Sequence, residues 1–309
     1  MLSKHLQFIK HISEVRDVNF YLTEPTRIST VYWAVNAHKI MKKPQEHPQE
    51  ILDFVMSCKN LDGGFGGNTG YPSTILTTFN ALQILYILKH PYTDENTLKY
   101  ICSRISPYGF FTNDRFKESD SRIQCSGVLS LRLYELLSKG DFSKESLSLK
   151  ISEEIIFPRS EIVNFIMKCY NTDGGFGNIP GGESHNAFTF CCLSALRSLG
   201  ALESFGESDL CRFIALRQHN NGGLSGRIGK KEDVCYSFWA YASLLMLGRR
   251  EVVDEKKLME FILSCESQKG GFSDRPGNEP DLYHLMFSLA ALGLLGYKDL
   301  YCVDPGFCL

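Results

Sequence analysis

The sequence predicts an all-α fold in which paired helices close into a ring, an α/α toroid. Three observations favour this fold. A glycine turn recurs along the chain, apolar helical segments follow the turns, and no stretch alternates polar and apolar residues as a half-buried strand would. The 309 residues are 43% hydrophobic and 22% charged, so the chain can bury a large core. We expect a single α/α-barrel domain over residues 1–309.

The repeated turn sets the length of the unit. It reads Cys-Lys-Asn-Leu-Asp-Gly-Gly-Phe-Gly from Cys58 and Cys-Tyr-Asn-Thr-Asp-Gly-Gly-Phe-Gly from Cys169. Weaker copies begin at Gln218 and Cys265, and a degenerate copy follows Tyr108. The first glycines fall at positions 63, 109, 174, 222 and 270, which gives a unit of roughly 48 residues. One longer interval predicts an insertion at 138–158, where Ser, Lys and Glu are frequent.

The segments around the turns predict helix pairs. Amphipathic segments precede the turns, at 50–58, 159–169 and 256–265, and more apolar segments follow them, at 74–88, 185–199, 233–248 and 283–296. Apolar residues with a period near 3.6, punctuated by glycine, indicate helices. The amphipathic helix of each pair should lie outside and the apolar one inside. Two N-terminal helices around 6–12 and 29–42 would complete the ring.

Ionisable residues recur at the predicted start of the inner helices. Eleven residues after the first glycine of successive turns stand Asp120, His185, Asp233 and Asp281. Helix capping alone explains an acidic residue there. Capping does not explain the further polar residues two or three positions on, which are Arg122, Cys235, Tyr236 and His284. We therefore expect a chemical site at this rim of the ring.

Asp233, Cys235 and His284 are candidate ligands of a zinc ion. Zinc accepts carboxylate, thiolate and imidazole, and a catalytic site combines three protein ligands with an open fourth position. Because the three residues occupy equivalent places in adjacent repeats, the ring should bring them together. The alternative is that Cys235 is an ordinary core cysteine in an apolar helix.

The neighbouring residues suggest a binding site for a long apolar diphosphate. Arg227, Lys230, Tyr236 and His185 could bind the anion beside helix N-termini, although a solvated basic loop is the simpler reading. A set of aromatic residues could line the interior of the ring around an apolar ligand, although core packing is the alternative for each: Trp33, Phe79, Phe188, Phe190, Phe238 and Trp239.

Charge and cysteine content exclude several classes. A formal net charge of −2 gives no nucleic-acid signature. The eleven cysteines lack CxxC pairs, which favours reduced thiols in a cytoplasmic protein. The N-terminus has no signal-peptide pattern, and the longest apolar run, 285–297, is too short to span a bilayer.

Four motifs give the chain a resemblance to a known family. They are Gly182-Glu-Ser-His-Asn186, Gly226-Arg-x-x-Lys230, Asp233-Val-Cys-Tyr-Ser-Phe-Trp239, and Asp281-x-Tyr-His284 preceded by Asp274-Arg-Pro-Gly277. With the repeated turns, they make the sequence similar to the β subunits of the protein prenyltransferases, and among these to the Rab geranylgeranyltransferase type. The resemblance runs over nearly the whole chain.

The resemblance implies a role for each matching residue. Asp233, Cys235 and His284 match the zinc ligands of the family, with Tyr236 beside them in the catalytic site. Asp274 matches an aspartate linked to magnesium in the farnesyl enzyme. The residues that match the diphosphate and isoprenoid site are His185, Asn186, Ala187, Arg227, Lys230, Tyr236, Trp239, Trp33, Arg122 and Cys191. Ser29 and Cys125 are small where bulky residues shorten or narrow the tunnel in relatives, which favours a twenty-carbon lipid, whereas Phe79 is larger than its Rab-type counterpart.

The resemblance also implies a reaction and partners. Zinc would hold an acceptor cysteine as a thiolate, and the thiolate would attack geranylgeranyl diphosphate. A separate α subunit would complete a heterodimer, and an escort protein would present the Rab GTPase. Three other readings remain open at this point: the β subunit of a CaaX-type farnesyl- or geranylgeranyltransferase, a terpene cyclase, and a catalytically silent toroid that serves as a binding scaffold.

Overall fold

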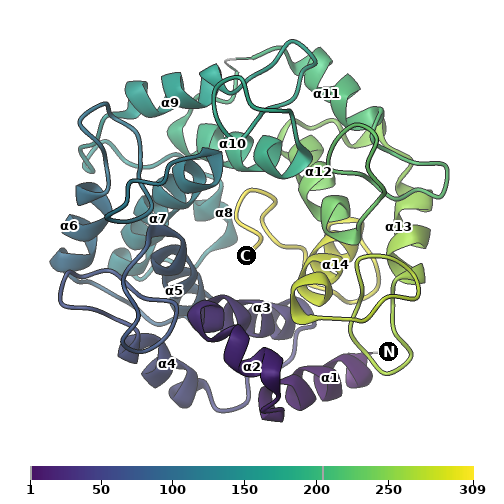
Figure 1. The fold of residues 1–309 in the computed structure, drawn as a ribbon, viewed down its shortest axis with the longest axis horizontal. Helices are drawn as coiled ribbons and strands as arrows, with labels where there is room; N and C mark the ends of the chain where they lie inside the picture. Colours follow the sequence, from purple (N-terminus) through teal and green to yellow (C-terminus); the bar gives the residue numbers. More distant parts are fainter. Residues whose placement is uncertain (1, 204) are drawn as a thin grey trace.

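The computed structural model describes residues 2–203 and 205–309, which form a closed ring of helices in two layers (Figure 1). The inner layer consists of α3 (Arg27–Ile40), α5 (Ile75–Ile87), α7 (Ser121–Lys139), α10 (Asn186–Leu199), α12 (Val234–Met246) and α14 (Leu282–Leu294). Each inner helix packs against the next, and α14 packs against α3, so the ring is closed. The predicted all-α toroid is confirmed.

The outer layer consists of α1 (Leu2–Glu14), α4 (Pro48–Ser57), α6 (Glu95–Ser103), α9 (Arg159–Lys168), α11 (Glu207–Ala215) and α13 (Glu255–Ser264). The sequence pattern assigned the layers correctly. The outer α4 buries only Val55 within its span, whereas the inner α5 buries residues around most of its circumference. An amphipathic helix covers the core with one face, and an apolar helix is enclosed by neighbours on every side.

Four shorter elements join these pairs: α2 (Val18–Leu22), η1 (Glu24–Thr26), α8 (Lys144–Leu147) and η2 (Arg250–Val252). Periodicity could not predict them because each is five residues or shorter. The expected insertion, 138–158, begins in the last turn of α7 and contains α8. Leu147 and Ile151 from this segment are buried, so part of it packs against the core.

The repeated turns bring one backbone close to another. The first glycine of every turn has a positive φ, from +85° at Gly109 to +97° at Gly270. A Cβ on Gly63 would lie 2.2 Å from the backbone oxygen of Asn96 in α6. Gly174 and Gly222 meet the backbone of the next outer helix in the same way. Each turn therefore needs glycine for its conformation and for its contact with the following unit.

The N-terminal helix α1 completes the last unit of the ring. A Cβ on Gly270 would lie 2.2 Å from the carbonyl oxygen of Lys4, so α1 holds the place that the next outer helix holds at the other turns. The backbone N–H of Gly271 donates to Nδ1 of His5 at 3.1 Å. Nε2 of His5 lies 3.0 Å from Glu266 Oε1. This clasp, formed by Lys4, His5, Glu266, Gly270 and Gly271, joins the first helix to the final turn.

Acidification should weaken this clasp. Burial lowers the pKa of His5 from its usual 6.5, although Glu266 opposes the shift. The folded protein thus keeps His5 neutral to a lower pH than the unfolded chain does. The free energy of unfolding should therefore be highest above pH 6.5 and should fall below it, where His5 takes up a proton in the unfolded chain but not in the folded protein. Within that window each pH unit costs up to about 1.4 kcal/mol. Urea unfolding at about pH 7.5 and 5.5 measures the loss.

Two variants isolate the His5 contribution. In His5→Gln the loss between the two pH values should shrink, whereas in His11→Gln, on the exposed side of the same helix, it should match the wild-type loss. An unchanged loss in His5→Gln would contradict this origin.

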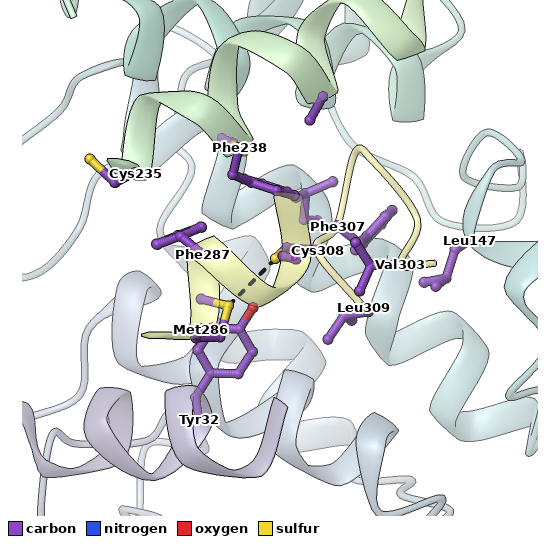
Figure 2. Close-up of a cluster of buried hydrophobic side chains, with 14 of the residues drawn as sticks. Tyr32, Leu147, Cys235, Phe238, Met286, Phe287, Val303, Phe307, Cys308 and Leu309 are labelled. Carbon is purple, nitrogen blue, oxygen red and sulfur yellow. Dashed lines mark hydrogen bonds between the residues drawn. The ribbon is translucent and has the colours of Figure 1, made fainter. Parts of the chain in front are cut away.

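The C-terminal residues enter the centre of the ring. In Figure 2, Phe307, Cys308 and Leu309 lie among side chains of the inner helices, including Tyr32, Phe238 and Met286. The three C-terminal residues are at most 4% exposed. A bidentate ion pair between Arg197 and Asp304, at 2.8 and 2.9 Å, anchors this segment to α10. One end of the ring is therefore filled by the chain itself.

Two expectations from composition can be compared with the structure. The eleven cysteines are all free thiols. Among the described residues, no helix is both long and apolar enough to cross a bilayer.

Candidate functional site

The site lies at the rim where the inner helices begin. The residue eleven positions after each first glycine caps the following inner helix: Thr74, Asp120, His185, Asp233 and Asp281 accept hydrogen bonds from the first-turn backbone. The capping explanation is therefore correct for all of these positions. The five caps mark the N-termini of five inner helices at the same rim of the ring. The polar residues that follow each cap in the sequence are therefore gathered at this rim.

Asp233, Cys235 and His284 converge at this rim. One potential ligand atom from each lies within 4.8 Å of the others. Asp233 caps α12, Cys235 lies in the first turn of α12, and His284 lies in the first turn of the neighbouring α14. Nε2 of His284 is 3.4 Å from Oδ1 of Asp233. Adjacent repeats thus bring together residues about 50 positions apart in the sequence.

Electrostatics shape the three groups. Burial raises the pKa of the Cys235 thiol well above its usual value. Burial also favours the neutral form of Asp233, but hydrogen bonds from His284 and Cys235 outweigh it and lower the pKa of the carboxyl group. Burial disfavours the charged form of His284, but Asp233 and Asp281 outweigh it and raise its pKa to about 9. The Asp233 carboxylate and the His284 imidazolium form an ion pair, and a cation bound between them would take the place of the proton on Nε2 of His284.

The donor set fits a zinc ion. Carboxylate, thiolate and imidazole are its usual ligands, and three of them leave a fourth position open for a substrate. The imidazole is also oriented as a ligand, because Nδ1 of His284 lies 2.7 Å from Oδ2 of Asp281 and leaves Nε2 directed at Asp233. A histidine ligand commonly has such a carboxylate on its second nitrogen. The group of potential ligands found among the described residues does not include Asp274.

Asp281 and Tyr283 belong to the site but were not singled out from the sequence as parts of it. From the sequence, Asp281 is accounted for as a helix cap only. Its spacing of three residues from His284 on a helix also predicts contact between the two side chains. Tyr283 interacts with the Cys235 thiol through its side chain, and its ring lies 5.2 Å from that of Trp33. The contact between Tyr283 and Cys235 joins two helices and has no local sequence signal.

Replacing Asp281 with asparagine should weaken metal binding by about 10–100-fold. Asparagine is as good a helix cap as aspartate, so α14 should remain intact while the negative partner of His284 is lost. Competition with a zinc chelator measures the affinity. Asp120→Asn, at the equivalent cap of α7, serves as the control and should keep wild-type affinity. Equal affinities in the two variants would exclude a positioning role for Asp281.

The predicted anion residues meet only in part. Tyr236 Oη lies 3.4 Å from Nε2 of His185, and their rings are in edge contact at 5.3 Å. Gly226 fits between them, because a Cβ there would lie 2.5 Å from His185 Nε2 and 2.6 Å from Tyr236 Cζ. Arg227 forms an ion pair with Glu183, so this cation would have to change partner to bind an anion. Glu183 lies within the quoted motif but had no predicted role.

His185 is prepared to donate a hydrogen bond. Its Nδ1 accepts from the backbone N–H of Ala187 at 3.1 Å, so the proton of the neutral ring resides on Nε2. Burial and the nearby Arg227 lower the pKa of His185, which keeps the ring neutral at pH 7. The side chain can therefore present one N–H toward the rim.

Asn186 requires a correction. The resemblance places Asn186 among the residues that bind the diphosphate and isoprenoid. In the structure its side chain is fully buried, and its Nδ2 donates to the carbonyl of Ser225 at 2.8 Å. Its backbone N–H donates to the carbonyl of Gly226. A ligand cannot reach this amide, which instead holds the loop that carries Arg227.

The predicted isoprenoid residues lie on several inner helices. Half-buried members of this set, which keep accessible surface, are Ser29, Trp33, Phe79, Ala187, Phe188, Phe190, Cys191 and Trp239. Ser29 donates to Asn80 at 2.7 Å, a partner that the sequence did not indicate. The Cys125 thiol is buried, and the neighbouring Cys191 together with burial raises its pKa well above the usual value. Arg122 at the rim pairs with Asp120. Phe238 is fully buried and packs on Phe190 and Phe287, so it is a core residue and cannot line an open interior.

A cavity of about 990 Å³ lies beside α3, under α2. Its lining includes Trp33 and Tyr283, together with residues of α1 and η1. Phe79, Cys191 and Trp239 are not among its lining residues. Its lining also includes Asp281, which contacts His284, but none of Asp233, Cys235 and His284.

Comparison with known proteins gives a consistent result. A family model described as the prenyltransferase alpha-alpha toroid domain matches residues 1–309. The geranylgeranyl transferase type-2 subunit beta of Candida albicans is 35% identical over 216 residues, which cover 65% of this chain and 58% of the relative. The protein of the same name from Saccharomyces cerevisiae is 34% identical over 214 residues, covering 66% and 60%. The matched stretch thus spans about three fifths of these relatives.

A solved structure extends the likeness of fold to almost the whole chain. Candida albicans protein geranylgeranyltransferase-I complexed with GGPP aligns with a TM-score of 0.81 and 22% identity, covering 99% of this chain and 95% of the other.

Proposed function

The chain belongs to the prenyltransferase alpha-alpha toroid family, and from this membership we propose that it is the catalytic β subunit of a Rab geranylgeranyltransferase. Such an enzyme transfers the lipid of geranylgeranyl diphosphate to C-terminal cysteines of Rab GTPases, forming a thioether and releasing diphosphate. The observation that carries the proposal is the convergence of Asp233, Cys235 and His284 beside the His185–Tyr236 pair. Both yeast relatives are named as type-2 geranylgeranyl transferase β subunits, and type 2 is the Rab class of this family, so their names support the Rab type.

The proposed cofactor is one zinc ion, held by the Asp233 carboxylate, the Cys235 thiolate and Nε2 of His284. When bound, zinc stabilises the acceptor cysteine as a thiolate at neutral pH and so supplies the nucleophile. Magnesium at Asp274 is not part of the proposed site, because that carboxylate is already engaged by Arg275 at 2.9 Å and Asn278 at 2.7 Å.

The residues of the chain would stabilise the leaving diphosphate. As the bond from the allylic carbon to oxygen breaks, negative charge grows on the diphosphate, and fixed donors stabilise that charge. Burial raises the pKa of Tyr236 to about 12, so its hydroxyl keeps its proton and donates, as does Nε2 of His185. Arg227, released from Glu183, and Lys230 would add two cations. The face of Trp239 could stabilise the partly cationic carbon.

The partners are also proposed. An α subunit would form the heterodimer, an escort protein would present the Rab GTPase, and this chain alone would have little activity. The deciding experiment is co-expression with a candidate α subunit, followed by transfer assays with farnesyl and geranylgeranyl diphosphate. The acceptors are an escorted Rab ending in two cysteines and a CaaX peptide. Transfer of geranylgeranyl to the Rab protein alone supports the proposal, transfer to the peptide favours a CaaX-type enzyme, and no transfer with a metal-free protein favours a scaffold.

Lipid length offers a prediction about Ser29. Replacing Ser29 with tryptophan puts a bulky side chain at a half-buried position of α3. It should shift donor use toward the shorter farnesyl diphosphate by roughly tenfold or more, since one extra or missing methylene in an apolar pocket is worth about 1–3 kcal/mol. Competition between the two labelled donors measures the ratio. Ser29→Ala, which removes only the hydrogen bond to Asn80, should leave the ratio unchanged. The same ratio in all three proteins would contradict a role for this position.

A further inference from the structure

A second pocket lies between the end of α11 and the loop after the fourth turn. It has a volume of about 470 Å³. Its charged and polar lining is Arg217, His219, Ser225, Lys230, Lys231 and Glu232. Lys230 is the only one of these that the proposed transferase site uses, so the other charges of the pocket are unexplained by that function.

Arg217 is the unusual member of this pocket. The residue is only 6% exposed, and its guanidinium makes no hydrogen bond or ion pair with any residue in 2–203 or 205–309. Its Nε is buried without a partner. The guanidinium lies over the ring of Phe213, 4.2 Å from its centroid. Burial lowers the pKa of Arg217, and the more distant Asp173 opposes this only in part. A buried cation without an anion is costly, because desolvation is not offset by pairing.

The other charges around the pocket favour an anion. Lys230 and Lys231 add two cations to Arg217. Glu232 is the one carboxylate in the lining, and it is already engaged, since Asn221 donates to it at 3.0 Å and Nδ1 of His219 lies 3.6 Å away. The lining thus keeps an excess of positive charge around Arg217, its most buried charged residue.

The equivalent arginine of another repeat shows that burial without a partner is not a general property of this position. Arg104 precedes its turn glycine by five residues, as Arg217 does, and it also lies over an aromatic ring of its outer helix, 5.4 Å from that of Tyr100. Arg104, however, is half-buried and donates from Nε to Ser103. The fold therefore accommodates a more exposed, hydrogen-bonded arginine at this position, so the deeper burial of Arg217 without such a bond is particular to the fourth unit.

From these observations we propose that the pocket is a binding site for a phosphate-type oxyanion, with Arg217 at its base and Lys231 at its mouth. A tetrahedral oxyanion can accept from a guanidinium and an ammonium group at once. Inorganic phosphate and inorganic diphosphate share this chemistry, and both fit a pocket of this size. This site shares Lys230 with the proposed diphosphate site, but Arg217 and Lys231 belong to this pocket alone, and the assignment does not depend on the proposed transferase reaction.

The test uses the full chain, purified with its partner subunit where one binds, in chloride buffer. Inorganic phosphate and, separately, diphosphate are titrated while thermal unfolding is followed, and binding of radiolabelled phosphate is measured by equilibrium dialysis. A ligand that binds only the folded state raises Tm by a steady step for each tenfold rise in concentration above Kd. We expect this rise in the wild type and its loss in Arg217→Met, with affinity weaker by roughly tenfold or more.

Three further variants make the result specific. Arg104→Met, the matched arginine of the second unit, should keep the wild-type phosphate response. Arg227→Met should also keep the response to inorganic phosphate, which separates this pocket from the proposed diphosphate site. If Arg217→Met does not fold, Lys231→Met, at an exposed position, should still weaken phosphate binding severalfold. A wild type without a phosphate response, or a full response in Arg217→Met or Lys231→Met, would overturn the assignment.

Discussion

Serine in place of Cys235 should abolish zinc binding at the proposed site and reduce the proposed prenyl transfer by more than about 100-fold, since altering even an outer partner of a metal ligand costs 10–100-fold. A thiol can lose its proton to a metal near neutral pH, whereas a serine hydroxyl cannot. Asp233 and His284 alone would then offer two ligands, too few for a stable tetrahedral site. Metal analysis of the purified protein, together with a transfer assay, measures both effects.

Cys102→Ser is the control for this experiment. Cys102 is a half-buried free thiol on the outer helix α6, so its loss should change neither metal content nor transfer. The Cys235 variant must also unfold at a temperature close to that of the wild-type apoprotein, because a collapsed fold would lose metal for another reason. Stoichiometric zinc in folded Cys235→Ser would refute the proposed ligand set.

Alanine at Gly63 should destabilise the fold by about 2–5 kcal/mol. The left-handed backbone of this residue, with φ of +89°, costs an alanine about 1–2 kcal/mol. The new Cβ would also lie 2.2 Å from the carbonyl oxygen of Asn96, and relief of such overpacking adds about 1–3 kcal/mol. Urea unfolding at neutral pH measures the sum.

Gly70 provides a control in the same repeat. Its φ is +79°, but no atom lies within 4 Å of the position that a Cβ would occupy. Gly70→Ala should therefore show only the conformational cost of about 1–2 kcal/mol. Equal losses at the two glycines would mean that the contact between the turn and α6 contributes nothing to stability.

The ring could be predicted from the sequence because the same glycine turn and helix pair recur along the chain. A turn that recurs five times fixes the phase of each helix, and this phase was enough to place Asp233, Cys235 and His284 at one rim although His284 is far from the other two in sequence. The same phase explained the caps, from Thr74 to Asp281. Properties that each unit repeats can thus be read from a single sequence.

Contacts that occur only once were not predictable in this way. The pairing of Arg227 with Glu183 and the hydrogen bond from Ser29 to Asn80 join residues that have no periodic relation. The burial of Asn186 could not be predicted either, because its hydrogen-bond partner Ser225 lies on the next loop and has no periodic relation to it. The entry of Cys308 into the ring leaves no pattern in a nine-residue segment that forms no regular helix.

The clasp between α1 and the turn at Gly270 has a consequence for biosynthesis. During translation, Lys4 and His5 leave the ribosome long before Glu266 and Gly271 exist, so the first helix must wait without its permanent neighbour while some 260 residues are added. The ring therefore cannot close at α1 before residue 271 has been made, and a nascent chain arrested before residue 270 should leave α1 open to protease, whereas the finished protein should protect it.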